Sequence, residues 1–285
     1  MKISSCFTAV LRSGVCLALF WGCTKAPFGE DDISAGSRQI RGRVELSRNL
    51  NPQGVFVWLD GVDVGTRTDK NGQFTITLPS VENQSARGGT SGVFNLYFYL
   101  ANFTLTTTPV VLRNGVFVYP QGEINKDGEL IRPKLIPELL HINIVVTPPI
   151  MTAPNIADTV LVEVKLSAVS DSVTVVFPKS IPDRFGALFF RNISSGAILV
   201  FPLFPGLTLD QTAIIGKATY TTIAVFYPAR MRLPPGKYEI IPYLLVKHAP
   251  IPPALIASLG DKVEALGPNY LMIPFRREGG SFELQ

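Results

Sequence analysis

The side chains that most often carry catalysis are few in this chain. Only two histidines occur, His141 in an apolar stretch and His248 beside a proline-rich turn. The HExxH, CxxC and GxSxG motifs are absent, as are the glycine patterns of nucleotide-binding loops. Both histidines are therefore predicted to be structural, and the sequence predicts a protein that is not an enzyme, with no cofactor, no catalytic residue and no metal site. Carboxylates that meet across strands would escape this search, so a hydrolase with such a site stays open as the alternative.

The stretch TDKNGQF, residues 68–74, offers oxygen ligands that a metal could use. Asp69, Asn71 and Gln73 alternate there, but a calcium loop needs more oxygen ligands and a distal glutamate. A turn explains the same residues better, because Asp and Asn side chains bond nearby backbone and Gly72 tolerates a positive φ. The stretch NKDGE at residues 125–129 is predicted to be a turn for the same reason.

Cys23 is the residue at which the sequence predicts a covalent modification. Lys2 and Arg12 precede a short apolar run, Val15–Trp21, which is too short to span a bilayer and suits the core of a signal peptide. The run ends in Gly22-Cys23, and this ending resembles the lipobox of bacterial lipoproteins. The resemblance implies cleavage before a lipidated Cys23, with residues 1–22 as the signal peptide and acyl chains such as palmitate as the anchor. An ordinary secretion signal is the alternative.

Cysteine usage agrees with export. All three cysteines, at positions 6, 16 and 23, lie in the N-terminal segment, so cleavage would leave Cys23 alone and no disulfide is expected. Residues 23–37 are predicted to be the lipidated cysteine followed by a flexible tether. Thr24 stands where an Asp would retain an enterobacterial lipoprotein in the inner membrane. We therefore expect an outer-membrane lipoprotein of the cell envelope that faces the periplasm or the cell surface.

The composition indicates short strands and frequent turns. Hydrophobic residues make up 46% of the 285 positions and charged residues 17%, and the chain holds 24 Gly and 23 Pro. Such punctuation favours an all-β fold over helices. The net charge of +4 comes with no long basic run, so nucleic acid is not an expected partner.

Three consecutive segments carry a family resemblance. They are IRGRVEL from residue 40, GVFVWLDG from residue 54 and VGTRTDKNGQFTITLP from residue 64. Their order resembles the carboxypeptidase regulatory-like domain, a transthyretin-like β-sandwich. The matching positions are Ile40, Gly42, Val44, Gly54, Val55, Val57, Leu59, Gly61, Thr66, Thr68, Asp69, Gly72, Phe74, Ile76, Leu78 and Pro79. The resemblance implies a non-catalytic module over residues 38–147, despite the name.

A second β-rich domain is expected over residues 148–285. The stretch LLHINIVVTP is predicted to be the last strand of the first domain, and Pro148, Pro149 and Pro154 mark the boundary. The strand patterns that follow suit an immunoglobulin-like or related sandwich. Apolar residues at helical spacing predict one helix near residues 253–266, which Gly267 would cap.

Two strands of the first domain are apolar on both faces. In GVFVWL, Phe56 and Trp58 alternate with the core positions, and in FNLYFYL so do Tyr97 and Tyr99. A strand with a solvated face should be polar there, so this face must be covered. Either the second domain packs over it, or these four rings form a ligand-binding surface for a sugar or a protein.

These inferences together predict a lipid-anchored cell-envelope protein. It would act as a non-catalytic binding or structural module, with the membrane as one partner through the anchor. A partner protein, a glycan or another envelope component would be the other. A lipid-anchored hydrolase with a carboxylate site assembled across strands is the alternative.

Overall fold

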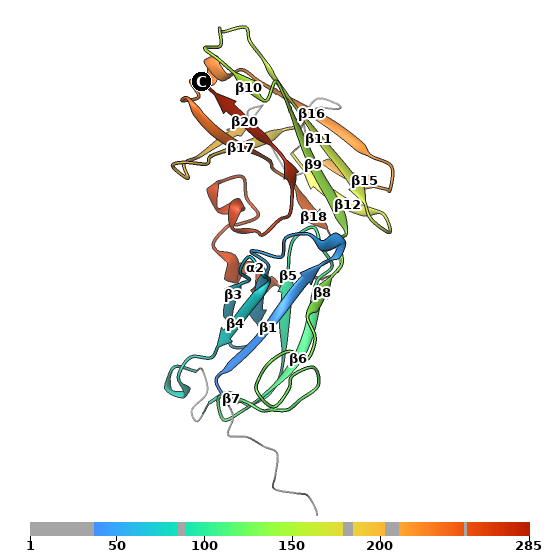
Figure 1. The fold of residues 1–285 in the computed structure, drawn as a ribbon, viewed down its shortest axis with the longest axis vertical. Helices are drawn as coiled ribbons and strands as arrows, with labels where there is room; N and C mark the ends of the chain where they lie inside the picture. Colours follow the sequence, from blue (N-terminus) through green and yellow to red (C-terminus); the bar gives the residue numbers. More distant parts are fainter. Residues whose placement is uncertain (1–36, 85–88, 179–184, 203–210, 248–249) are drawn as a thin grey trace, which may run out of the picture.

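The computed structural model describes residues 37–84, 89–178, 185–202, 211–247 and 250–285. Cys23 and His248 lie outside the described residues. The molecule is elongated, with residues 37–136 at one end and residues 140–285 at the other (Figure 1). The fold is all-β and sandwich-like with few helical turns, as the composition predicts. No helix of the described part is long and apolar enough to cross a membrane.

The first half is built from two sheets that face each other. Its strands are β1 (Gln39–Leu46), β2 (Phe56–Leu59), β3 (Val64–Arg67), β4 (Gln73–Thr77), β5 (Gly92–Tyr99), β6 (Thr106–Arg113), β7 (Val116–Phe117) and β8 (Lys134–Ile136), with the 3₁₀ turns η1 (Ser47–Asn49) and η2 (Val81–Asn83). The sheets have the strand orders β4-β1-β8 and β3-β2-β5-β6-β7. Alternating apolar residues of both sheets, such as Ile40, Ile76, Val57 and Phe98, meet in the first core.

Two matching turns hold β1 from either side. Asp69 Oδ1 accepts from the backbone N–H groups of Asn71 and Gln73, at 2.8 Å each. Asn125 Oδ1 accepts in the same way from Asp127 at 2.9 Å and from Glu129 at 3.0 Å. Each turn ends in a glycine with φ +77°, whose carbonyl accepts from a backbone N–H of β1. The prediction that both stretches are turns is confirmed.

Thr68 explains one position of the family-like pattern. It is 3% exposed, and its Oγ1 accepts from the N–H of Val55 at 2.9 Å and donates to the carbonyl of Pro52 at 2.5 Å. The hydroxyl thus ties the start of the turn to the strand before it. Apolar residues of the same size would leave both backbone groups unpaired.

The second half contains three sheets. Its strands are β9 (Leu140–Thr147), β10 (Ile150–Met151), β11 (Val160–Ala168), β12 (Val173–Phe177), β13 (Ala187–Asn192), β14 (Ile198–Pro202), β15 (Gln211–Ile215), β16 (Tyr220–Phe226), β17 (Gly236–Pro242), β18 (Leu245–Lys247), β19 (Glu278–Gly279) and β20 (Ser281–Leu284). The strand orders are β10-β20-β17-β13-β14, β16-β11-β9-β19 and β15-β12-β18. The short helices are α1 (Pro228–Met231), α2 (Pro253–Leu259) and the 3₁₀ turn η3 (Pro268–Met272).

Strand β9 lies in the second half, which differs from the prediction. It pairs with β11 from Leu140↔Ala168 to Thr147↔Leu161, and its inward side chains join the second core. The first core ends at Ile136, so the change of core falls several residues before Pro148. The alternating pattern of residues 140–147 predicted a strand with one buried face correctly. It held no information on which sheet would cover that face.

The predicted helix is shorter than its apolar pattern. Helix α2 ends at Leu259, because Gly260 leaves helical geometry with φ 141° and ψ 173°. Residues 261–266 form turns instead, and Val263 reaches the same apolar cluster as Leu255 and Leu259 from a loop. Spacing alone could not separate these two arrangements.

Candidate functional site

The four aromatic residues proposed from the sequence lie on neighbouring strands. Antiparallel pairing of β2 and β5 places Phe56 opposite Tyr99 and Trp58 opposite Tyr97. The ring centroids of Trp58 and Tyr97 are 5.8 Å apart. Trp58 Nε1 also donates to Asp63 Oδ1 at 3.0 Å. The predicted alternation is confirmed, because the residues between them on both strands face the first core.

The second half covers this aromatic face. Trp58 is 1% exposed and Tyr99 is 3% exposed, and both pack in one cluster with Phe189 and Tyr243 of the second half. Helix α2 adds Leu255 and Leu259 to the cluster. The rings therefore do not form an open ligand surface, and only Tyr97 stays half-buried. A sheet that is apolar on both faces needs a cover, and here a second sheet provides it.

Tyr270 is the centre of the junction between the halves. Its hydroxyl donates to the carbonyl of Leu244 at 2.7 Å, and its ring stacks on Phe189 with centroids 5.1 Å apart. Tyr243 packs edge-on against it at 4.9 Å and donates to the carbonyl of Glu264 at 2.7 Å. Burial raises the pKa of Tyr270, Tyr243 and Tyr99 above the usual tyrosine value. From the sequence alone, Tyr243 and Tyr270 could be recognised only as parts of further segments that are apolar on both sides. Nothing in the sequence paired them with the aromatic face of the first half.

A single buried amide joins the chain segments at the junction. Asn102 is fully buried, and its Nδ2 donates to the carbonyls of Leu140 at 2.8 Å and Arg276 at 2.9 Å. Its Oδ1 accepts from the N–H of Arg276 at 2.9 Å. Ala101 N–H also donates to the carbonyl of Pro274 at 2.7 Å. Backbone hydrogen bonds thus continue from one half into the other.

His141 lies in a cluster of polar and charged side chains with Arg48, Glu138 and Glu278. Arg48 Nη1 lies 2.9 Å from Glu138 Oε2 and 3.2 Å from His141 Nδ1. Glu278 approaches both Arg48 and His141, at 3.7 and 3.8 Å. Arg48 thus pairs with both Glu138 and Glu278 and compensates negative charge there. Within the described ranges no group of His, Cys, Asp and Glu is arranged to hold a metal ion.

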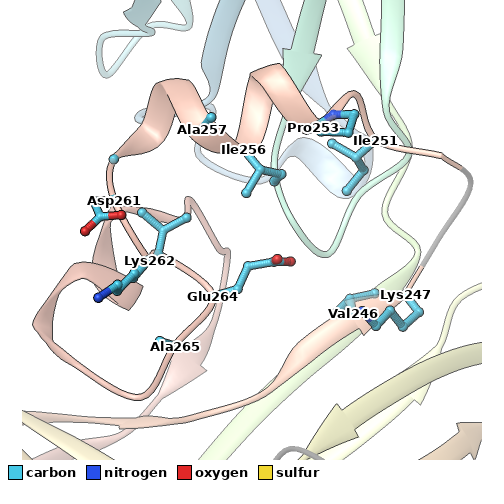
Figure 2. Close-up of a pocket in the computed structure, with 12 residues that line it drawn as sticks. Val246, Lys247, Ile251, Pro253, Ile256, Ala257, Asp261, Lys262, Glu264 and Ala265 are labelled. Atoms are coloured by element: carbon cyan, nitrogen blue, oxygen red, sulfur yellow. The ribbon is translucent and has the colours of Figure 1, made fainter.

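The largest cavity described here opens beside α2. Its volume is about 860 Å³, within the range of small-molecule sites. Helix α2 and the loop after it enclose the space, with β18 along a third side (Figure 2). Ile256 and Glu264 point into the space between the helix and the loop (Figure 2). Asp261 and Lys262 stand at the loop end, so the wall is partly apolar and carries charges of both signs.

The α2 pocket carries charged groups of both signs. Its carboxylates, Asp261 and Glu264, occur with two lysines, Lys247 and Lys262. Glu138 and Glu278, the two glutamates near His141, do not line this pocket. The pocket was not found from the sequence, because it forms where α2 ends early and the chain turns back toward β18.

Comparisons with known proteins give no family. No family model matches the chain, and no curated protein matches it. A solved structure of a proposed carbohydrate-binding protein from Bacteroides uniformis is similar over 75% of this chain and 92% of its own, at 11% identity and a TM-score of 0.33. BcpA, the major pilin subunit of Bacillus cereus, is similar over 71% of this chain and 63% of its own, at 15% identity and a TM-score of 0.25. The Bacillus anthracis TIE protein follows at 9% identity and a TM-score of 0.23, over 75% of this chain and 48% of its own. These likenesses are too distant to transfer a ligand or an activity.

Proposed function

We propose that this protein is a lipid-anchored cell-envelope protein that acts as a non-catalytic binding module. Three features support the proposal. The N-terminus resembles a lipoprotein signal ending at Cys23, and residues 38–79 resemble the carboxypeptidase regulatory-like domain. The third is the open α2 pocket, and it carries the binding function because its volume and mixed wall suit a small polar ligand.

The proposed ligand is a polar envelope molecule such as an oligosaccharide. Lys247, Asp261, Lys262 and Glu264 supply donors and acceptors for hydroxyl groups, while the side chains of Ile251 and Ile256 provide apolar surface. The buried aromatic seam, Phe56, Trp58 and Tyr99 with the second half packed on it, then serves to fix the pocket relative to the first half. The same proposal includes a lipid anchor at Cys23 and a position at the outer membrane. It also includes a division of the chain into two domains.

Filling the pocket tests this function. Ala257 lines the pocket from an exposed position of α2, so Ala257→Trp should block ligand access with little loss of stability. Ala254→Trp is the matched control, since Ala254 is exposed on the same helix but does not line the pocket. We expect the wild type and Ala254→Trp to bind the same members of an oligosaccharide array and Ala257→Trp to lose them. Equal binding by both variants, or no binding by the wild type, would reject an oligosaccharide site in this pocket.

A further inference from the structure

A second cavity lies at the junction, and four arginines are among the residues that line it. Its volume is about 250 Å³, and it shares no lining residue with the α2 pocket. Arg67 reaches it from the first half, and Arg191, Arg276 and Arg277 from the second. We call this cavity the arginine cleft. Glu239 is the single carboxylate among its lining residues.

Only one of the four guanidinium groups has a carboxylate partner within the described residues. Arg191 pairs with Glu239, its neighbour across β13 and β17. Arg67, Arg276 and Arg277 make no ion pair with any described residue. Four cations and one anion leave three positive charges around a small space. Such a cluster is unfavourable unless an anion or solvent compensates it.

The guanidinium groups are held in place by neutral acceptors. Arg67 Nη2 donates to the carbonyl of Met272 at 2.6 Å, and Arg276 Nη2 donates to the carbonyl of Gln53. Arg277 Nη2 lies 3.3 Å from the hydroxyl of Tyr270, and its guanidinium carbon lies 4.3 Å from the centroid of Phe275. These contacts fix the orientation of each fork before any ligand arrives.

Two of the four arginines are partly withdrawn from solvent. The Nε atoms of Arg276 and Arg277 are buried and meet no acceptor among the described protein groups. Burial also lowers the pKa of Arg67 and Arg276. Arg67 and Arg191 are nevertheless exposed at the surface, whereas Arg276 and Arg277 are half-buried. The uncompensated positive charge of the arginines, rather than these two buried atoms, therefore favours an anion in the cleft.

We propose that the arginine cleft binds one compact oxyanion group, namely a phosphate, a sulfate or a carboxylate. Planar guanidinium forks match the paired oxygens of these groups and hold them bidentately. The volume lies below the roughly 300–1,000 Å³ of sites for drug-sized ligands, so the cleft takes a single anionic group. The site adds a charge-selective position to the molecule and does not depend on the ligand of the α2 pocket.

Bracing of the two halves is the competing explanation for these arginines. It accounts for Arg67 and Arg276, whose hydrogen bonds cross between the halves. It does not account for Arg277 or Arg191, whose bonded partners lie in the second half. The test therefore changes Arg277, because its loss removes a positive charge without breaking a bond across the junction.

Isothermal titration of the intact mature chain with inorganic phosphate, sulfate and glucuronate tests the proposal. We expect saturable binding of at least one probe, weakened by added salt. Arg277→Gln should reduce the affinity at least about tenfold. The affinity of Arg277→Lys should lie between those of the wild type and Arg277→Gln, because lysine keeps the charge but loses the bidentate guanidinium geometry. Arg113→Gln, at an exposed position of β6 outside the cleft, should bind as the wild type does.

Stability measurements separate a lost site from a lost fold. A saturating probe should raise the thermal midpoint of the wild type and of Arg113→Gln, and should leave Arg277→Gln unchanged. If Arg277→Gln does not fold, Arg191→Gln takes its place and should weaken binding because Glu239 is left unpaired beside the cleft. The α2-pocket variant Ala257→Trp should keep its oxyanion binding. No saturable binding of any probe, or equal binding by Arg277→Gln and the wild type, would overturn the proposal.

Discussion

Asn102 connects three chain segments through one side chain. Its amide bonds the backbone at Leu140 and Arg276, and the second of these lies 174 positions away in sequence. An apolar replacement would leave buried carbonyl and N–H groups without partners, which is costly in a site closed to water.

Asn102→Ala should therefore lower the free energy of unfolding by about 2–4 kcal/mol. Asn83→Ala is the control, because Asn83 is exposed in η2 and its side chain makes no hydrogen bond to a residue that the structure describes. Urea unfolding of both variants measures the difference. Equal midpoints for the two variants would show that Asn102 does not hold the junction.

The junction tyrosines predict how stability depends on alkaline pH. Burial raises the pKa of Tyr270, Tyr243 and Tyr99 above the usual tyrosine value of about 10, so the folded state favours the neutral phenols. Their contribution is complete below about pH 10 and is lost as the pH rises through the higher folded-state values. The free energy of unfolding should fall steeply above pH 10, and Tyr243→Phe should flatten that fall. A slope that neither Tyr243→Phe nor Tyr270→Phe changes would contradict this assignment.

At the scale of elements, the turn that ends at Gly72 sets the register of β4 against β1. Gly72 has φ +77°, and a Cβ there would stand 2.2 Å from the carbonyl oxygen of Val44. Gly196 has a similar φ of +71° and no atom within 4 Å of its Cβ position. The two glycines therefore separate the cost of the backbone angle from the cost of the clash.

Gly196→Ala should destabilise the protein by about 1–2 kcal/mol, the usual cost of a left-handed alanine. Gly72→Ala should cost at least about 3 kcal/mol, because displacement of β1 adds to that strain. Chemical unfolding of the two variants provides the comparison. Similar losses would mean that the turn moves away from β1 without penalty.

Local patterns predicted the strands well and their partners poorly. Alternation in FVWL and in FNLYFYL fixed which residues face the core and which face outward. It could not give the pairing of Trp58 with Tyr97, nor the second half as the cover, because those depend on contacts between distant segments. The arginine cleft was missed for the same reason, since its residues come from positions 67, 191, 276 and 277. Strand β9 shows the limit most clearly, because the strand was predicted correctly but expected in the first domain, whereas it pairs with β11 of the second half.

At the scale of the whole molecule, the buried seam should make the halves unfold together. Cleavage before Cys23 would remove Trp21, so Trp58 would be the remaining tryptophan, and it lies in that seam. Trp58 fluorescence should therefore report separation of the halves, while far-UV circular dichroism reports loss of the sheets. We expect both signals to change in one coincident urea transition. A red shift of the fluorescence ahead of the dichroism change would show that the halves separate first.

Lipid attachment predicts a sharp response at one cysteine. Cys23→Ser should block processing and labelling with radioactive palmitate, because the modified sulfur is lost. Cys16→Ser lies in the predicted signal peptide and should leave processing unchanged. Acyl burial contributes about 0.8 kcal/mol per CH₂, so the anchored wild type should stay with membranes at high salt. Normal maturation and membrane retention of Cys23→Ser would exclude the anchor.

If Cys23 carries a lipid anchor, the direction of β1 would set the height of the molecule above the bilayer. Ser37 bonds to Phe117 of β7 at the end of the first half farthest from the second half (Figure 1). With Cys23 anchored, that end would face the lipid, and β1 would rise away from it by about 26 Å over its eight residues. The tether adds up to about 50 Å at full extension. The α2 pocket and the arginine cleft would then stand clear of the headgroups, at a distance where large molecules could reach both without touching the membrane.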